Sequence, residues 1–523
     1  MDNGPSEKTH KLGNGLTKRK DRVGVTKPVS ILITILLLAV YCFAFQGRRG
    51  LFDPDEGRYS AVALQMIKSG DWVVPRTHPA QEHWAKPPLT YWAIAGSLLL
   101  FGHSEFAVRF PNALSFFLCV VIAYFLGRVF TPQRPWLTAL VFGTFLFPAT
   151  VCNGATTDYL MTMWQAAAVC CFARAYWGKK DSKRVLSVWL MWISFGLAFL
   201  TKGPPALLPL VSIMVFLRMT GWKRKDFTMS WVPGLLLMVL TGASWLIVMT
   251  AQKPGLLRYF VWDEFFLRVF TGHHARHAQW YSFIYIYFPV LILGALPWSY
   301  FTGRGMMGAV QKAGAKKDAF AQQGLFLSLW FFIPLAVFIV SKSNLPLYVL
   351  PLFLPLAAMT AREMEKNNFP ISTYRTKIIF WCILLILARP VMGGLKFSRD
   401  ASAFAGEIRS RYAGPVGECV FVNVRPALGL QFYTGADVKR VALEPADMGG
   451  LYRGQGTRLW FVPPEDAERF REMAGRLNIP VRDLGLIHER DEYALYREMK
   501  PSKLPASTSL PTAGREAGYL TRQ

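Results

Sequence analysis

The chain has 523 residues, of which 52% are hydrophobic, 14% aromatic and only 18% charged. A soluble enzyme of this length would divide into several domains with charged surfaces, and a disordered chain would lack this aromatic content. The composition therefore favours a polytopic membrane protein.

Apolar runs predict about eleven to thirteen spans. The segment 1–28 is polar and basic, and the run at 29–47 follows it without a small-residue cleavage site. We expect an uncleaved first span with its N-terminal side in the cytoplasm. The further runs lie near 108–128, 135–152, 158–177, 185–201, 204–218, 231–250, 283–301, 323–341, 345–361 and 377–393.

The formal charge of +26 would suit either nucleic-acid binding or basic cytoplasmic loops. Alternating spans from a cytoplasmic start place four longer loops inside, and each carries Lys and Arg. These loops are 178–184, 219–230, 302–322 and 362–376. Because the spans were chosen on apolarity alone, the charge is an independent check, and it excludes nucleic acid as a partner.

The same alternation places loops 48–107 and 251–282 outside, and a domain at 397–500 after the transmembrane domain at 29–396. In that outside domain, strands are predicted at 420–424, 458–462 and 494–496, and a helix at 465–477. We expect a small α/β domain, followed by a disordered Pro/Ser/Thr/Gly-rich tail at 501–523. The seven cysteines form no CxxC pair, so neither a cysteine zinc site nor a disulfide framework is predicted.

Acids crowd the start of the first outside loop. Asp55 and Glu56 follow Asp53 within four residues, and carboxylates beside a membrane suit a divalent cation or a general base. The alternative is the start of a helix that runs through Ala61 to Lys68. Asp158 has the same two interpretations. It either belongs to the same site as Asp55 or caps the helix that follows it.

Lysines shortly before prolines recur on the predicted outer side. Lys86, Lys202 and Lys342 each precede a proline and an apolar run. Proline suits a first helical turn, and a helix N-terminus with a lysine binds anions. Three such ends on one face indicate a phosphate at the interface, whereas a single lysine would more simply reach for lipid headgroups.

The second outside loop holds arginines and histidines. Arg268 and Arg276 could grip a phosphate with their planar guanidinium groups. His273, His274 and His277 could ligate a metal, or could be solvated at the surface.

In these motifs the chain resembles the bacterial lipid A 4-amino-4-deoxy-L-arabinose transferases. These are GT-C membrane glycosyltransferases related to protein O-mannosyltransferases, and the resemblance runs over about 29–360. It rests on the order and spacing of Asp55-Glu56-Gly57-Arg58-Tyr59, Ser69-Gly70-Asp71-Trp72, Lys86-Pro87-Pro88-Leu89-Thr90-Tyr91-Trp92, Thr157-Asp158, Thr201-Lys202-Gly203-Pro204 and Ser341-Lys342-Ser343-Asn344-Leu345-Pro346-Leu347-Tyr348.

The resemblance implies an all-α GT-C membrane domain with a periplasmic C-terminal α/β domain. It implies an inverting transferase at the periplasmic face of the inner membrane. The donor would be a sugar on undecaprenyl phosphate, and the most specific form moves aminoarabinose to lipid A phosphate.

The resemblance also assigns residues. Asp55 and Asp158 match the two acids of the family, with Glu56 as a neighbouring catalytic candidate. Groups that match or suit the donor phosphate are Arg58, Tyr59, Lys86, Lys202, Arg268, Arg276, Lys342 and Tyr348. His273 or His274 matches a metal-ligating histidine, but its usual glutamate partner is not found, so a divalent cation is a candidate cofactor only.

Two alternatives stay open. The first is a polyprenyl-phosphate-sugar transferase that acts on another glycan or on a protein. The second is a lipid-phosphate transporter, which would place polar groups near mid-membrane and show repeats. Here the polar groups crowd one face and no repeat is visible, so the transferase is favoured.

Overall fold

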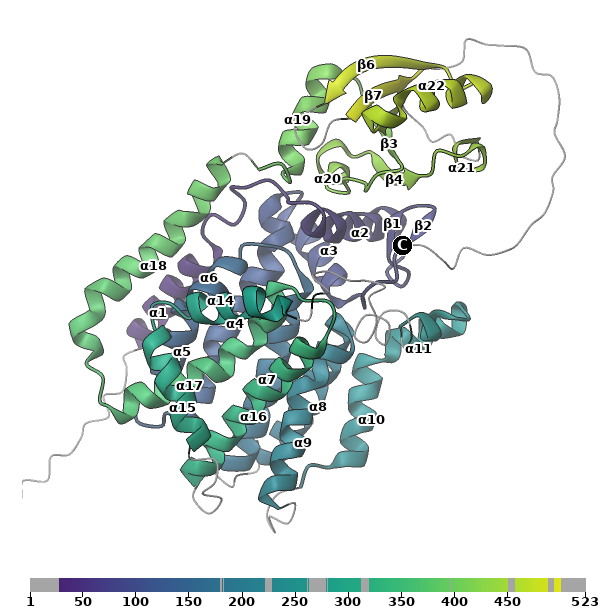
Figure 1. Cartoon of the computed structure of the whole chain (residues 1–523). Coiled ribbons are helices and arrows are strands. Elements are labelled where there is room, and N and C mark those ends of the chain that lie inside the picture. Colours follow the sequence, from purple (N-terminus) through teal and green to yellow (C-terminus); the bar gives the residue numbers. More distant parts are fainter. Residues whose placement is uncertain are drawn as a thin grey trace, which may run out of the picture.

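The computed structural model describes residues 28–499 except 179–180, 182, 222–227, 261, 263–278, 280, 312–318, 396, 450–456 and 488–492. A helical bundle carries a smaller α/β body at one end (Figure 1). The bundle helices are α1 (Pro28–Phe43), α4 (Glu105–Phe130), α5 (Trp136–Thr144), α6 (Leu146–Val151), α7 (Thr157–Trp177), α8 (Lys183–Lys202), η1 (Pro204–Leu207), α9 (Leu208–Thr220), α10 (Trp231–Gly242), α11 (Ser244–Gln252), α12 (Leu256–Arg258), α14 (Ser282–Gly294), α15 (Ser299–Gln311), α16 (Ala319–Val340), η4 (Pro346–Leu352), α17 (Phe353–Lys366) and α18 (Ile371–Gly394).

Each predicted apolar run is helical over most of its length, and the chain is a multi-pass membrane protein. Among the described residues, five helices are long and apolar enough to cross a membrane, and two bent pairs raise this number to seven. The bends are 57° between α10 and α11 and 107° between α14 and α15. The helix count by length therefore falls below the count of apolar runs, because several runs are broken or short.

Aromatic side chains fill the centre of the bundle. Phe172 of α7, Phe216 of α9 and Phe326 of α16 have ring centroids 5.3 to 6.3 Å apart. Such tilted and edge-to-face pairs add to the burial energy of the rings. They hold the helices that carry the site in a fixed arrangement.

A layer of short elements covers one end of the bundle. It comprises α2 (Asp55–Ser69), the hairpin of β1 (Arg76–His78) and β2 (Gln81–Glu82), and α3 (Leu89–Phe101). The helix α3 is apolar, although it lies within the loop 48–107 that the sequence placed outside. This layer separates the bundle from the α/β domain (Figure 1).

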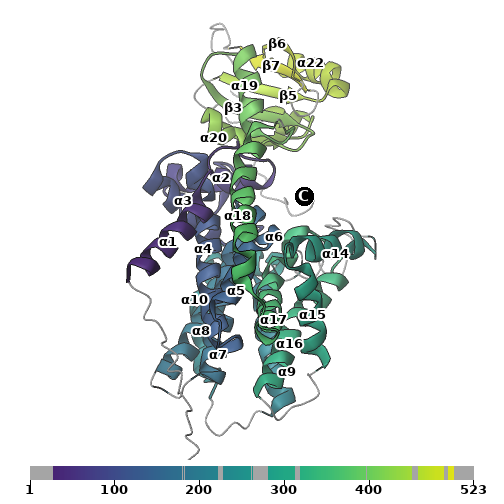
Figure 2. The ribbon, with the colours of Figure 1, turned by 90° about the vertical axis from the view of Figure 1, so that its left-hand side faces the viewer.

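The C-terminal domain is a five-stranded sheet with the strand order β4-β3-β5-β7-β6. The strands β3, β4 and β5 are parallel, and β7 is antiparallel to both of its neighbours. The long helix α18 runs along the bundle and leads into this domain (Figure 2). Its elements are α19 (Ala401–Arg411), β3 (Val416–Val422), α20 (Leu430–Thr434), β4 (Asp437–Val441), α21 (Pro445–Gly449), β5 (Thr457–Val462), η5 (Pro464–Asp466), α22 (Ala467–Arg476), β6 (Val481–Ile487) and β7 (Tyr493–Glu498).

The predicted small α/β domain is therefore confirmed. The predicted strand at 420–424 overlaps β3, the predicted strands at 458–462 and 494–496 fall within β5 and β7, and the predicted helix overlaps α22. The strands β4 and β6 were not predicted, because Asp437-Val-Lys-Arg-Val and Val481-Arg-Asp-Leu-Gly carry charges at positions that partly face water.

Candidate active site

The first half of the site is the first turn of α2. Arg58 donates from Nη2 to Asp55 Oδ1 at 2.6 Å, and the Asp55 side chain is 44% exposed. Burial disfavours the charged guanidinium, but Tyr59 and Asp55 outweigh it and raise the pKa of Arg58. Its Nε is buried and has no hydrogen-bond partner in the described structure. Arg58 therefore offers a fixed positive charge with an unused donor.

The second half comes from α7 and α8. Asp158, the second residue of α7, is buried and forms an ion pair with Lys202, the last residue of α8. The Lys202 ammonium also lies 4.6 Å from the centre of the Tyr348 ring in η4. Gly203 follows with φ at +81°, a conformation that favours glycine, so the chain turns sharply directly after the lysine.

Tyr59 joins the two halves. Its side chain is buried, and its ring centroid lies 5.8 Å from that of Tyr91 in α3. Burial raises the pKa of Tyr59, and the charges of Asp55, Asp158 and Lys202 all reach its phenol. Both acids and both cations therefore face one region, at the end of the bundle covered by the C-terminal domain.

An apolar cavity adjoins this region. Pro87, Gly203 and Pro204 line one side of it, and Trp245 and Phe260 line another. Lys86 and Lys202 immediately precede these lining residues, and the Lys86 side chain is half-buried. The arrangement combines cationic groups with an adjacent apolar space.

Trp84 belongs to the same aromatic surroundings. Its ring centroid lies 6.1 Å from that of Tyr259, and its indole Nε1 is buried with no partner among the residues described. Sequence reasoning gave no role to Trp84, two residues before Lys86, or to Tyr91, which lies within the motif that begins at Lys86. The two aromatic residues close to Lys86 in the sequence were the feature that could have indicated their role.

Glu56 has surroundings unlike those of Asp55. Its carboxylate accepts hydrogen bonds from Arg49 at 2.7 and 3.2 Å and from Arg109 at 2.8 and 3.0 Å. Backbone N–H groups of Phe52 and Ala155 add bonds of 2.7 and 3.1 Å. Burial alone would raise the pKa of Glu56, but Arg109 and Arg49 lower it to about 2.

The sequence held a signal for this cluster that was missed. Arg109 is fully buried within the apolar helix α4, and a charged residue in such a run needs a partner. Arg49 is the second residue after the first apolar run. Together they fix Glu56 and the start of α2, and so position Asp55.

The helix-start alternatives are partly confirmed. Asp55 and Glu56 lie in the first turn of α2, but the N-cap residue, Pro54, makes no side-chain cap hydrogen bond. For α7 the cap is Thr156, whose side chain accepts from the Asp158 N–H, so Asp158 does not cap the helix itself.

The remaining candidates lie elsewhere or outside the described residues. Lys342 is exposed in the segment before η4, where the buried Asn344 contacts the Tyr287 hydroxyl at 2.9 Å. The candidates that fall on residues that are not described are Arg268, Arg276, His273 and His274. Among the described residues, no group of three His, Cys, Asp or Glu side chains could hold a metal ion.

Comparison with known sequences finds relatives that are named for lipid-linked sugar transfer. Residues 85–248 match the family model described as dolichyl-phosphate-mannose-protein mannosyltransferase. A protein from Proteus mirabilis named undecaprenyl phosphate-alpha-4-amino-4-deoxy-L-arabinose arabinosyl transferase 2 is 30% identical over 66% of this chain and 60% of its own length. A transferase 1 of the same designation from Pseudomonas fluorescens is 30% identical over 71% of this chain and 65% of its own length.

Similarity to solved structures identifies the fold. The crystal structure of ArnT from Cupriavidus metallidurans bound to undecaprenyl phosphate matches with a TM-score of 0.70 and 18% identity, over 92% of this chain and 100% of that one. The chain has the GT-C fold. The Archaeoglobus fulgidus oligosaccharyltransferase matches more distantly, with a TM-score of 0.51 and 13% identity, over 87% of this chain and 69% of that one.

The resemblance and the fold class predicted from the sequence are thus confirmed. The aligned part of the chain spans about 60% of the length of the curated relatives that it matches. The segments that carry Lys86, Asp158 and Lys202 lie within the matched family model, which covers residues 85–248.

Proposed function

We propose that the chain transfers a sugar from undecaprenyl phosphate to an acceptor at the outer face of the bacterial inner membrane. The observation that carries this proposal is that the charges of Arg58 and Lys202 both act on the buried Tyr59, while Lys202 also lies against Tyr348 and immediately precedes Gly203 of an apolar cavity. Phosphate needs cationic groups, and the first isoprene units need an apolar surface next to them. The most specific form of the proposal moves aminoarabinose to a phosphate of lipid A.

The cations act on the leaving group. As the acceptor oxygen bonds to the anomeric carbon, the bond from that carbon to the phosphate oxygen breaks, and its electron pair stays on the phosphate. Arg58 and Lys202 are held by Asp55 and Asp158, so they meet this charge without reorganisation. Attack opposite to the leaving group inverts the anomeric centre.

Asp55 is the exposed acid of the site, and its role depends on the acceptor. A hydroxyl acceptor must lose a proton, and Asp55 could accept it as a general base. A phosphate acceptor is already a nucleophile, and Asp55 would then orient the donor sugar through Arg58. Asp158 holds Lys202, and Glu56 is a positioning residue because arginines and backbone N–H groups occupy its carboxylate.

The described part of the site is poorly suited to a divalent cation. The two described carboxylates of the site each face a cation, which is a poor arrangement for binding a divalent ion. His273 and His274 stay candidate ligands in loop 251–282.

The orientation follows from charge. The loops 178–184, 219–230, 302–322 and 362–376 each carry Lys and Arg, which favours a cytoplasmic position for them. The site, the loop 48–107 and the domain at 397–500 would then lie in the periplasm. Membrane lipids surround the segment 29–396.

Mass spectrometry of lipid A tests the function. Cells with the wild-type protein should carry an aminoarabinose increment on lipid A phosphate, and cells with Asp55→Asn should lack it at equal protein levels. An increment that persists with Asp55→Asn overturns the role of Asp55. If lipid A is unchanged by the wild-type protein, the aminoarabinose and lipid A pair is wrong, and surface glycans and secreted proteins become the acceptors to examine.

A further inference from the structure

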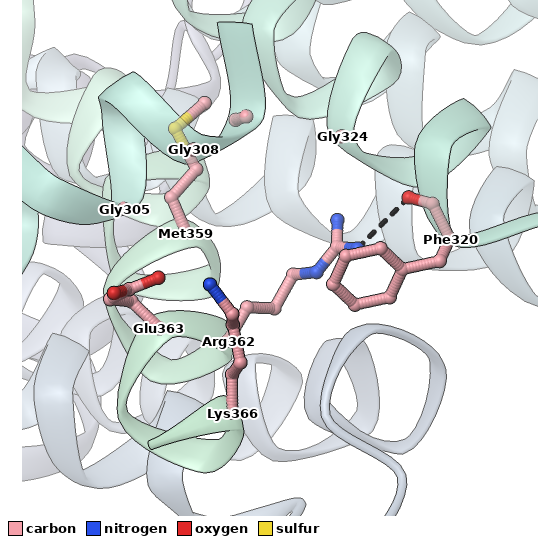
Figure 3. Close-up of a pocket in the computed structure, with 9 residues that line it drawn as sticks. Gly305, Gly308, Phe320, Gly324, Met359, Arg362, Glu363 and Lys366 are labelled. Carbon is pink, nitrogen blue, oxygen red and sulfur yellow. Dashed lines mark hydrogen bonds between the residues drawn. The ribbon is translucent and has the colours of Figure 1, made fainter. Parts of the chain in front are cut away.

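A second cavity lies at the opposite end of the bundle from the candidate active site. It is enclosed by α15, α16 and α17 (Figure 3). The helix α17 starts directly after η4, which carries Tyr348 of the site, and ends at this cavity. The cavity is therefore separate from the groups assigned to sugar transfer.

A buried arginine forms one wall. The Arg362 side chain is only 7% exposed, and its Nη2 donates to the Phe320 carbonyl at 2.9 Å. Its guanidinium carbon lies 3.9 Å from the centre of the Phe320 ring. Lys366 is one turn further along α17, and Figure 3 shows its ammonium pointing back between Arg362 and Glu363.

Among the described residues that line the cavity, cations outnumber acids. Glu363 is the single acid among the described residues that line it, against Arg362 and Lys366. Glu363 also accepts from Arg304 Nε at 3.2 Å and from Asn367 Nδ2 at 2.8 Å, so its charge is shared with a third cation. Cations gathered in a partly buried space favour an anionic ligand.

Glycines keep the space open. A β-carbon on Gly308 would lie 3.8 Å from Glu363 Oε2, and one on Gly324 would lie 3.8 Å from Arg362 Nη1. A larger side chain at either position would occupy the volume beside the charged groups. The hollow therefore results from the sequence of α15 and α16.

Apolar side chains that neighbour the lining residues in sequence, and Phe320 of the lining itself, are exposed. Met307 and Val310 of α15 are 59% and 50% exposed, and Phe320 of α16 is 41% exposed. Exposed apolar groups on a membrane helix contact acyl chains. A cationic pocket next to such a surface matches a molecule with an anionic head and apolar tails.

We propose that this cavity binds the phosphodiester headgroup of an anionic phospholipid from the leaflet at this end of the bundle. Arg362 and Lys366 bind the phosphate, and the acyl chains lie along Met307, Val310 and Phe320. Basic pockets between transmembrane helices on the cytoplasmic side are suited to such headgroups. The proposal does not depend on the identity of the transferred sugar.

Native mass spectrometry of the purified full chain tests the proposal. The protein is titrated with phosphatidylglycerol and, separately, with phosphatidylethanolamine. We expect one phosphatidylglycerol to bind more tightly than the rest, and its affinity to fall about tenfold or more in Arg362→Gln/Lys366→Gln. The matched control is Arg375→Gln/Lys377→Gln, which removes the same charge from exposed positions of the neighbouring α18 and should leave that affinity unchanged.

Two further variants keep the test decisive if Arg362→Gln fails to fold. Lys366→Gln changes an exposed residue, and Gly308→Leu fills the cavity without changing the charge; both should weaken phosphatidylglycerol binding. Equal losses in the control pair, or no loss in any cavity variant, would overturn the proposal. Displacement of the lipid by millimolar inorganic phosphate or glycerol phosphate would also overturn it, because the ligand would then be a soluble phosphate.

Discussion

The adjacent acids Asp55 and Glu56 show how strongly surroundings decide the role of a residue. Asp55 is partly exposed and contacts one arginine, whereas Glu56 is buried among two arginines and two backbone N–H groups. A catalytic acid must be accessible to the substrate. A buried acid that holds a loop in place must have all of its hydrogen bonds satisfied. The pair therefore combines an accessible carboxylate with the anchor that positions it.

Glu56 should give the chain a distinctive dependence of stability on pH. Its pKa is about 2 in the folded chain, below the ordinary value of 4.5. Stability from this group is therefore present above pH 4.5 and is lost as the pH falls through that value toward 2, and it amounts to about 3 kcal/mol. Thermal unfolding in detergent should show this loss for the wild type.

Glu56→Gln identifies the source of that loss. The variant should be less stable at neutral pH, and its stability should fall less steeply between about pH 5 and about pH 3. Glu444→Gln removes an exposed acid and should leave the wild-type curve unchanged. Parallel curves for Glu56→Gln and the wild type would contradict the assignment.

Variants of Asp158 and Lys202 allow the effect of this ion pair on stability to be measured separately from its effect on sugar transfer. Asp158→Asn leaves a buried ammonium without its counter-charge and should cost about 3 kcal/mol or more. Asp158→Asn/Lys202→Met removes both charges and should recover part of this loss while transfer stays abolished. Unfolding midpoints and transfer assays on the three proteins measure both effects, and a double variant that transfers sugar would rule out Lys202 as a phosphate-binding group.

At the scale of elements, α18 holds α1 against the bundle through one side chain. Arg389 donates to the carbonyls of Tyr41 at 2.8 Å, Cys42 at 3.3 Å and Ala44 at 3.0 Å. These carbonyls lie at the C-terminal end of α1, where the helix leaves acceptors unsatisfied and a cation is favourable. The contact explains a buried arginine in an otherwise lipid-exposed helix.

Arg389→Met should therefore loosen α1. We expect faster hydrogen exchange across 29–47 and a loss of about 2 kcal/mol in stability, because hydrogen bonds from a charged donor are removed. Arg375→Met alters an exposed arginine of the same helix and serves as the control. Unchanged exchange at 29–47 in Arg389→Met would show that apolar packing alone holds α1.

Helices were predictable because their sequence patterns are local. Contacts between side chains of different helices were not predictable. The apolar runs placed the bundle helices, and the motif around Asp55 placed α2. The contact of Lys202 with Asp158 depends on how α7 packs against α8, and no spacing in the sequence encodes it. The arginines that bind Glu56 lie seven and 53 residues away, so only their burial in apolar surroundings could have hinted at them.

At the scale of the molecule, the C-terminal domain docks on the layer that carries the site. The Gly429 N–H donates to Asp53 Oδ1 at 3.0 Å, and a β-carbon on Gly57 of α2 would lie 2.5 Å from that same nitrogen. Lys68 pairs with Asp437 at 2.9 Å, and His78 contacts Glu418 at 3.3 Å. The domain therefore holds both ends of the segment that presents Asp55 and Arg58.

Among these residues, Tyr433 contacts two separate parts of the chain through a single hydroxyl. Its hydroxyl accepts from the Leu51 N–H at 2.8 Å and donates to Glu105 at 3.0 Å, so one atom joins the domain, the loop before α2 and the start of α4. Tyr433→Phe removes that atom without changing the ring. It should leave both domains folded and free the segment that positions Asp55.

We therefore expect Tyr433→Phe to lower the rate of transfer severalfold while undecaprenyl phosphate binding changes little, because the geometry of Asp55 relaxes more than the site at Lys202. The control is Tyr412→Phe, which removes a hydroxyl that contacts Thr457 at 3.0 Å within the C-terminal domain. Transfer assays, lipid-binding titrations and hydrogen exchange across 51–58 should separate the two variants. Equal rates for both variants would mean that the Tyr433 hydroxyl contributes nothing to the placement of Asp55.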